Sequence, residues 1–173
     1  TNICRLILSL TFIISGFVKA VDPLGTQYKI NDYLEAMHLT ALLPDYLTLS
    51  MSVLLSACEY TIGIMLLFAA HRRVVSKLIL LIMVIMTPIT LWLALFNPIS
   101  NCGCFGDAIE LTNWQTFFKN VVLLVAAVIV WRKPDYMHRF VSQSNQWIVL
   151  NYTIIFVLFI SGYCLYKLPL FDF

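Results

Sequence analysis

The sequence predicts an all-α integral membrane protein with five transmembrane helices. Hydrophobic residues make up 61% of the 173 residues and charged residues only 12%, whereas a soluble domain carries roughly 25% charged residues. The chain also has five apolar stretches that reach or approach the roughly 20 residues needed to cross a bilayer. These stretches run approximately over Ile3–Val21, Tyr46–Ala70, Val74–Phe96, Phe117–Trp131 and Trp147–Leu168.

This length and composition restrict the domain organisation and the partners. Five membrane spans leave no room for a separate soluble domain of ordinary size, and no internal repeat or domain linker interrupts them. The main partner that the composition predicts is the lipid bilayer. We expect no nucleic-acid partner.

The connection between the first two spans is long enough to contain structure of its own. Asp22–Gly25 has the composition of a turn, and Tyr28–Met37 follows it with apolar residues on one helical face. We expect a short surface helix here that covers one membrane end of the bundle. Further along the chain, Pro88 should kink the third span, and Thr112 with Asn113 should cap the fourth.

The distribution of basic residues predicts the orientation. Basic residues concentrate in the second and fourth connections, and the first and third are mainly acidic. The basic residues are Arg72, Arg73 and Lys77 in the second and Arg132, Lys133 and Arg139 in the fourth. By the positive-inside rule, these connections and the amino terminus are cytoplasmic, and the carboxyl terminus lies outside.

Two cysteines in the third connection carry the main functional hypothesis. Cys102 and Cys104 lie in Asn-Cys-Gly-Cys-Phe-Gly-Asp, between two membrane spans and on the predicted outer side. A disulfide across one glycine closes a very small ring, so it is strained and easily reduced. The following helix amino terminus would lower the thiol pKa, which favours a reactive thiolate. The motif therefore predicts a redox-active pair.

Two alternatives to a redox pair remain open. In the first, Cys102 and Cys104 supply half of the ligands of a metal site. In the second, they are chemically inert. A structural metal site usually has four ligands, and the chain offers no matching second pair, so we expect no metal. The other cysteines are scattered through the spans, where packing explains a cysteine best. They are Cys4, Cys58 and Cys164.

Three residues within the spans are candidates for supporting roles. Glu59 lies near the middle of the second span, where an ionisable side chain normally faces the bundle and is functional. It is either a proton carrier for quinone reduction or a neutral acid bonded to the hydroxyl of Tyr60, Thr61 or Thr90. Lys19 either extends to the headgroups or pairs with Asp22, Asp107 or Glu59. Gly16 permits close approach of another backbone or of a flat ring.

Several of these segments together resemble the MauE branch of the DoxX-like membrane proteins. They are Ser15-Gly16-Phe17-Val18-Lys19 in the first span, Glu59 with Gly63 in the second, and Cys102-Gly103-Cys104-Phe105-Gly106 after the third. The resemblance implies a four-helix membrane domain over residues 1–131, with an architecture like that of DsbB and the vitamin K epoxide reductases. Residues 132–173 then add a cytoplasmic connection and a fifth transmembrane helix.

The resemblance also implies a function in the bacterial inner membrane. Related proteins are associated with disulfide formation or quinone-linked sulfur oxidation, and MauE with maturation of a disulfide-rich methylamine dehydrogenase subunit. The chain departs from DsbB in lacking two separate cysteine pairs, and it lacks the Cys-x-x-Cys of the epoxide reductases. A single pair must then meet both the protein partner and the electron acceptor.

These observations lead to a thiol–disulfide oxidoreductase as the main hypothesis. Cys102 and Cys104 would exchange electrons between a periplasmic thioredoxin-fold or disulfide-rich protein and a membrane quinone. Glu59 would be catalytic, and Lys19, Gly16 and Phe105 would contact the quinone. The alternative is a non-catalytic anchor or assembly subunit of a larger membrane complex.

Overall fold

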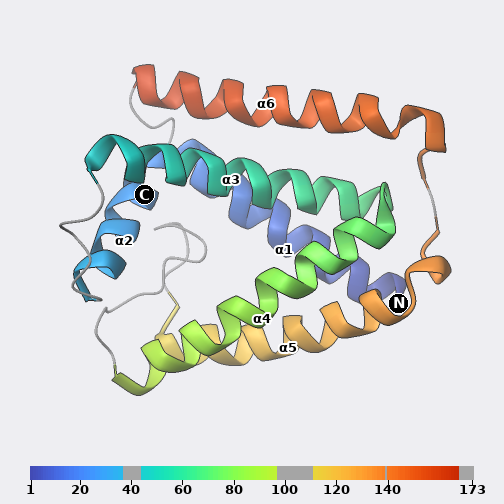
Figure 1. Cartoon of the computed structure of the whole chain (residues 1–173), viewed down its shortest axis with the longest axis horizontal. Helices are drawn as coiled ribbons and strands as arrows, with labels where there is room; N and C mark the ends of the chain where they lie inside the picture. The colour runs from blue at the N-terminus through green and yellow to red at the C-terminus, as the bar shows by residue number, and fades with distance from the viewer. Residues whose placement is uncertain (37–43, 97–110, 139, 168–173) are drawn as a thin grey trace.

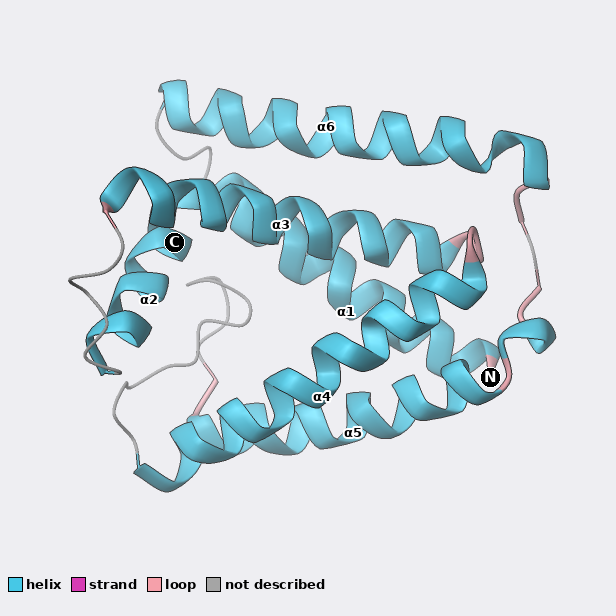
Figure 2. Ribbon diagram, viewed as in Figure 1, coloured by secondary structure: helices cyan, strands magenta, loops and turns pink. Residues whose placement is uncertain are grey.

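The computed structural model describes residues 1–36, 44–96, 111–138 and 140–167. These residues form α-helices and two short 3-10 helices, with no strand among them (Figure 2). In chain order the elements are α1 (Asn2–Val21), α2 (Pro23–Ala36), α3 (Asp45–Leu67), α4 (Arg72–Phe96), α5 (Asn113–Arg132), the 3-10 helices η2 (Pro134–Tyr136) and η3 (Gln143–Asn145), and α6 (Gln146–Lys167). All the α-helices except α2 are long and apolar enough to cross a membrane. The predicted all-α membrane fold is confirmed.

Local sequence signals explain where two of these helices begin. Thr112 caps α5 in a capping box, in which its hydroxyl accepts from the Gln115 backbone and the Gln115 side chain accepts from the Thr112 backbone. The predicted cap is therefore confirmed. The predicted turn at Asp22–Gly25 is wrong, because α2 already begins at Pro23. The Asp22 carboxylate accepts from the Gly25 backbone N–H at 2.9 Å, and proline is favoured in a first helical turn.

The transmembrane helices are arranged as two closely packed pairs and one peripheral helix (Figure 1). α1 packs along α3, and α4 packs along α5. α6 lies against α3 and α1, on the side away from α4 and α5. At one end of the bundle, α3 connects to α4, and α5 connects to α6. We call this end the basic end. We call the opposite end, where α2 lies, the α2 end.

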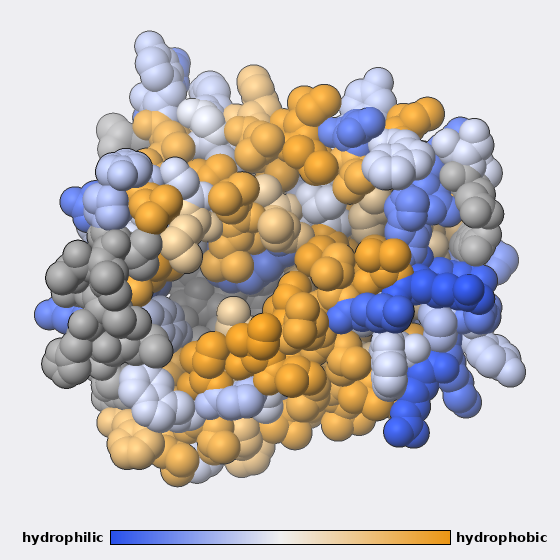
Figure 3. Space-filling view, viewed as in Figure 1, coloured by the Kyte–Doolittle hydropathy of each residue, from blue (hydrophilic) through white to orange (hydrophobic). Residues whose placement is uncertain are grey.

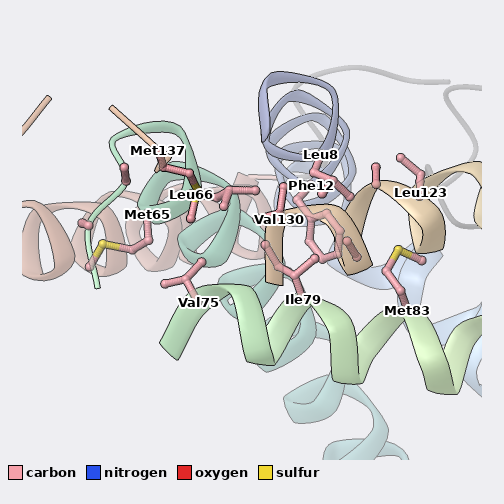
Figure 4. Packing of buried hydrophobic residues seen from close by; sticks show 14 residues of the cluster. Leu8, Phe12, Met65, Leu66, Val75, Ile79, Met83, Leu123, Val130 and Met137 are labelled. Carbon is pink, nitrogen blue, oxygen red and sulfur yellow. The ribbon is translucent and has the colours of Figure 1, made fainter. Parts of the chain in front are cut away.

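The hydrophobic core fills the space between the two pairs toward the basic end. Figure 4 shows side chains from α1, α3, α4 and α5 meeting there. The most deeply buried include Leu8, Leu66, Ile79 and Val130, all with no exposed surface. Met137, from the connection after α5, completes this cluster. Close packing of side chains holds the two helix pairs together at this end.

Buried and charged side chains fix the connection between α5 and α6 to the basic end. The guanidinium of Arg5 donates to the carbonyl of His138 at 2.7 Å and lies over the ring of Phe140. Arg72 pairs with the carboxylate of Asp135 at 2.7 Å. The two helix pairs are therefore tied together by polar contacts as well as by the core.

At the α2 end, α2 crosses the first turns of α3. The Gln27 amide donates to the Asp45 carbonyl at 3.0 Å and to the Thr48 hydroxyl at 3.2 Å. The Ser52 hydroxyl donates to the Pro23 carbonyl at 2.7 Å. α2 thus lies across one end of the bundle, as the sequence predicts for this helix (Figure 1).

Candidate functional site

Ser15, Lys19 and Glu59 form a buried cluster between α1 and α3, which we call the ion-pair cluster. The Lys19 ammonium lies 2.7 Å from each carboxylate oxygen of Glu59. The Ser15 hydroxyl donates to Glu59 Oε2 at 2.8 Å, and Lys19 Nζ lies 3.2 Å from Ser15 Oγ. The side chains of Lys19 and Glu59 are only 7% and 10% exposed.

This geometry decides between the alternatives left open by the sequence. Extension of Lys19 to the headgroups is wrong, because its ammonium points into the bundle toward Glu59. Bonding of Glu59 to the hydroxyl of Tyr60, Thr61 or Thr90 is also wrong, since its partners are Lys19 and Ser15. The ion pair between Lys19 and Glu59 was among the predicted arrangements.

Glycines allow the ion-pair cluster to form. A Cβ atom on Gly16 of α1 would lie 2.8 Å from the Tyr60 Cα of α3. One on Gly63 of α3 would lie 2.8 Å from the Ile13 backbone nitrogen of α1. The two helix backbones therefore approach more closely than larger residues permit. Gly16 thus contacts a neighbouring backbone, one of its two predicted uses.

A buried ion pair is an expensive feature in a membrane helix. Each charge loses its hydration, and only good geometry with further hydrogen bonds compensates for that loss. Glu59 obtains such compensation from two donors, and Ser15 and Lys19 share one face of α1 because they are four residues apart. Since an apolar pair of similar size would pack there without this penalty, the charges point to a functional role.

The ion-pair cluster forms part of the wall of a cavity of about 630 Å³. The cavity lies between the two helix pairs, and α2 contributes to it as well. Most of its lining is apolar and includes Phe12, Leu55, Met83, Met86 and Trp92. Figure 3 shows a hollow between α3 and α4 with a largely hydrophobic rim. This volume falls within the range of sites for small molecules, roughly 300–1,000 Å³.

A second polar group lines the cavity from the other helix pair. Asn120 of α5 is 3% exposed, and its amide nitrogen donates to the Thr90 hydroxyl of α4 at 3.2 Å. The cavity therefore has polar groups on walls from both helix pairs, with apolar side chains around them. This combination is typical of sites that bind a mainly apolar ligand in one orientation.

Cys102, Cys104 and Phe105 lie outside the described residues. The segment that contains them connects Phe96, the last residue of α4, to the residues that precede α5. Both of these helix ends lie at the α2 end of the bundle (Figure 1). Within the described part, Cys4, Cys58 and Cys164 are free thiols.

Sequence reasoning missed several residues of this site. Ser15 was noted only as part of a motif, although a polar side chain four residues before a buried lysine is a natural helix-face partner. Asn120 was missed entirely, although a polar side chain well inside an apolar helix is a recognisable signal. The apolar lining, by contrast, carries no sequence signal that distinguishes it from ordinary core residues.

Comparison with known protein families decides the family. The family model of the methylamine utilisation protein MauE matches residues 1–132. The chain belongs to the MauE family. Every residue that lines the cavity lies in the part that matches MauE, and α6 lies beyond it. No curated protein and no solved structure matches the chain.

Proposed function

We propose that this MauE-family protein is a membrane thiol–disulfide oxidoreductase that passes electrons between a protein partner and a membrane quinone through Cys102 and Cys104. The observation that carries the proposal is the buried ion-pair cluster in the wall of an apolar cavity, at the end of the bundle that the cysteine segment adjoins. An ionisable pair within membrane-spanning helices is by default the mark of a functional site.

The cavity fits a quinone in its size and in the chemistry of its lining. Its volume of about 630 Å³ accommodates an aromatic ring with part of an isoprenoid tail. Met83, Met86 and Trp92 offer the polarisable and aromatic surfaces that pack well against a flat ring. The ammonium of Lys19 lines the cavity, where its positive charge would stabilise negative charge on a ring oxygen. The hydrophobic rim between α3 and α4 supports entry from the lipid (Figure 3).

The proposed reaction balances in electrons and protons. The partner's dithiol reduces the Cys102–Cys104 disulfide by exchange, through a mixed disulfide that resolves to the partner's disulfide and two cysteine thiols. Reoxidation of these thiols releases two electrons and two protons, which a bound quinone accepts on becoming a quinol. Lys19 Nζ holds a proton beside the cavity. Glu59, with its hydrogen bond from Ser15, keeps that ammonium charged and oriented.

The charge distribution supports a topology for this reaction. Arg72, Arg73, Arg132 and Lys133 all lie at the basic end, which we place on the cytoplasmic side of the bacterial inner membrane. The α2 end, the cysteine segment and the carboxyl terminus then face the periplasm, where disulfides persist. The partner would be a periplasmic thioredoxin-fold or disulfide-rich protein. The MauE family is described as methylamine utilisation proteins. This description supports a partner protein that takes part in methylamine utilisation.

Replacement of the cysteines tests the proposal. The protein in nanodiscs is mixed with a reduced thioredoxin-fold protein and duroquinone, and loss of partner thiols and of quinone absorbance are followed together. We expect Cys102→Ser, Cys104→Ser and the double variant to abolish both signals. Cys58→Ser is the matched control, because Cys58 is an exposed free thiol within α3, and it should retain both.

Two results would count against the proposal. Undiminished quinone reduction by the double cysteine variant would show that electrons take another route. In a second experiment, free thiols are labelled in cells with and without a mild reductant. If wild-type Cys102 and Cys104 stay in one redox state under both conditions, the result would favour the non-catalytic assembly subunit instead.

A further inference from the structure

Asn120 is a buried amide that the proposed reaction does not use. It lies within the transmembrane helix α5, is 3% exposed and lines the same cavity as Lys19 and Glu59. Placing an amide in an apolar environment costs free energy unless its polar atoms have partners. Its position in the cavity wall makes a bound ligand a natural partner.

Thr90 fixes the orientation of this amide. The Thr90 hydroxyl lies 3.0 Å from the carbonyl oxygens of Met86 and of Thr87. Carbonyl oxygens only accept, so the single hydroxyl hydrogen is directed to them. Toward Asn120 the Thr90 oxygen can therefore only accept, and Nδ2 of Asn120 is the atom that faces it, at 3.2 Å. The amide oxygen Oδ1 is left to accept a hydrogen bond from another group.

Asn120 and Ser15 of the ion-pair cluster lie at similar distances from the ends of their helices near the α2 end. Asn120 is seven residues after Asn113, the first residue of α5, and Ser15 is six residues before Val21, the last residue of α1. At the α-helical rise of about 1.5 Å per residue, Ser15 lies roughly 9 Å and Asn120 roughly 10.5 Å from these helix ends. The two polar positions belong to different helix pairs, and both line one cavity.

We propose that Asn120 is the second polar contact for the ligand, and that the cavity selects flat rings with hydrogen-bonding oxygens on opposite edges. One hydroxyl would donate its hydrogen to the Glu59 carboxylate beside Lys19, and the opposite hydroxyl would donate its hydrogen to Asn120 Oδ1. This inference rests on the proposed function and specifies the ligand class of the same site. Para-hydroquinones have this arrangement of oxygens, whereas a phenol with a single hydroxyl satisfies only one wall.

Two ring compounds that differ by one hydroxyl test the inference. Durohydroquinone carries two opposite hydroxyls on a tetramethylated ring, and durenol carries one. Binding of each is measured by anaerobic calorimetry against nanodiscs that hold the protein, with protein-free nanodiscs as the blank. We expect the wild type to bind durohydroquinone about 3- to 10-fold more tightly, the value of one net hydrogen bond. Asn120→Leu should reduce this preference to within about 2-fold.

Asn113→Leu is the matched control. It makes the same change two turns earlier in α5, at a buried asparagine that does not line the cavity, and it should keep the wild-type preference. Thr90→Val provides a second test, because it removes the oxygen that orients the amide. We expect it to reduce the preference as well, and it decides the matter if Asn120→Leu does not fold.

The outcomes separate this inference from the proposed function. If the wild type binds neither duroquinone nor durohydroquinone, both the quinone site and the role of Asn120 are wrong. If it binds both, but Asn120→Leu weakens durenol as much as durohydroquinone, only the role of Asn120 is wrong. A wild-type preference that survives in both Asn120→Leu and Thr90→Val would overturn the inference in the same way.

Discussion

The two ends of this helical bundle differ in how the space between the same helix pairs is filled. Toward the basic end, fully buried side chains such as Leu66, Ile79 and Val130 pack between the pairs. Toward the α2 end the pairs enclose a cavity of about 630 Å³, with a buried ion pair in its wall. Close packing at one end holds the pairs together and permits an open, polar-walled space at the other.

The ion-pair cluster offers the largest effect with which to test this comparison. Lys19→Met should destabilise the protein by about 3–5 kcal/mol, because it leaves the Glu59 carboxylate buried and unpaired. Combining it with Glu59→Gln should recover much of that loss. The free energy of unfolding is measured by titration with a denaturing detergent in mixed micelles.

Under the proposed function, the rate of quinone reduction should follow a different pattern in the same variants. It should be lost in Lys19→Met and remain lost in the double variant, because stability returns without the charges. Full activity in the double variant would show that the ion pair is structural only.

The second-largest effect on stability is expected at the contact between α1 and α3. Gly16→Ala should destabilise the protein by about 1–3 kcal/mol, because the added methyl group would overlap the Tyr60 backbone, which cannot move aside as a side chain can. Gly162→Ala in α6 is the matched control, since a Cβ there meets nothing within 4 Å. A loss of stability in both variants would point to helix propensity or insertion rather than to close packing.

Truncation of two isoleucines one turn apart in α4, one in the core and one at the cavity wall, compares the two kinds of packing. Ile79 is fully buried in the core, and Ile79→Ala should cost about 2 kcal/mol, the lower end of the range for core truncations, since lipid is as apolar as the side chain. Ile82→Ala, one turn along α4 at the cavity wall, should cost less. Equal losses on detergent titration would mean that the cavity is packed as tightly as the core.

The smallest effect is expected at the surface of the basic end. Asp135→Asn removes the partner of Arg72 and Arg73, but Asp135 is half-exposed, and exposed ion pairs contribute about 0.2–1 kcal/mol. The difference from the wild type should shrink further as salt is raised during the unfolding titration. A loss as large as that of Lys19→Met would contradict the view that only the buried pair matters.

Composition and periodicity alone determined the membrane fold. Each of the five predicted spans became a long helix, because a backbone in lipid must satisfy its own hydrogen bonds and a helix does so within one segment. The capping residues of α5 were also readable, since Thr112 and Gln115 act through contacts only three residues apart. The prediction failed at Asp22–Gly25, where the same residue types serve a turn and a helix start equally well.

Only the tertiary structure decided the partners of the charged and polar residues. The sequence named Lys19 and Glu59, but several possible partners for each were compatible with it. Glu59 meets Lys19 because Gly16 and Gly63 bring α1 and α3 close together, and Asn120 joins the same cavity through α5. Such contacts depend on how helices distant in the chain pack, which no local pattern encodes. The sequence thus determined which groups are available, and packing determined which of them meet.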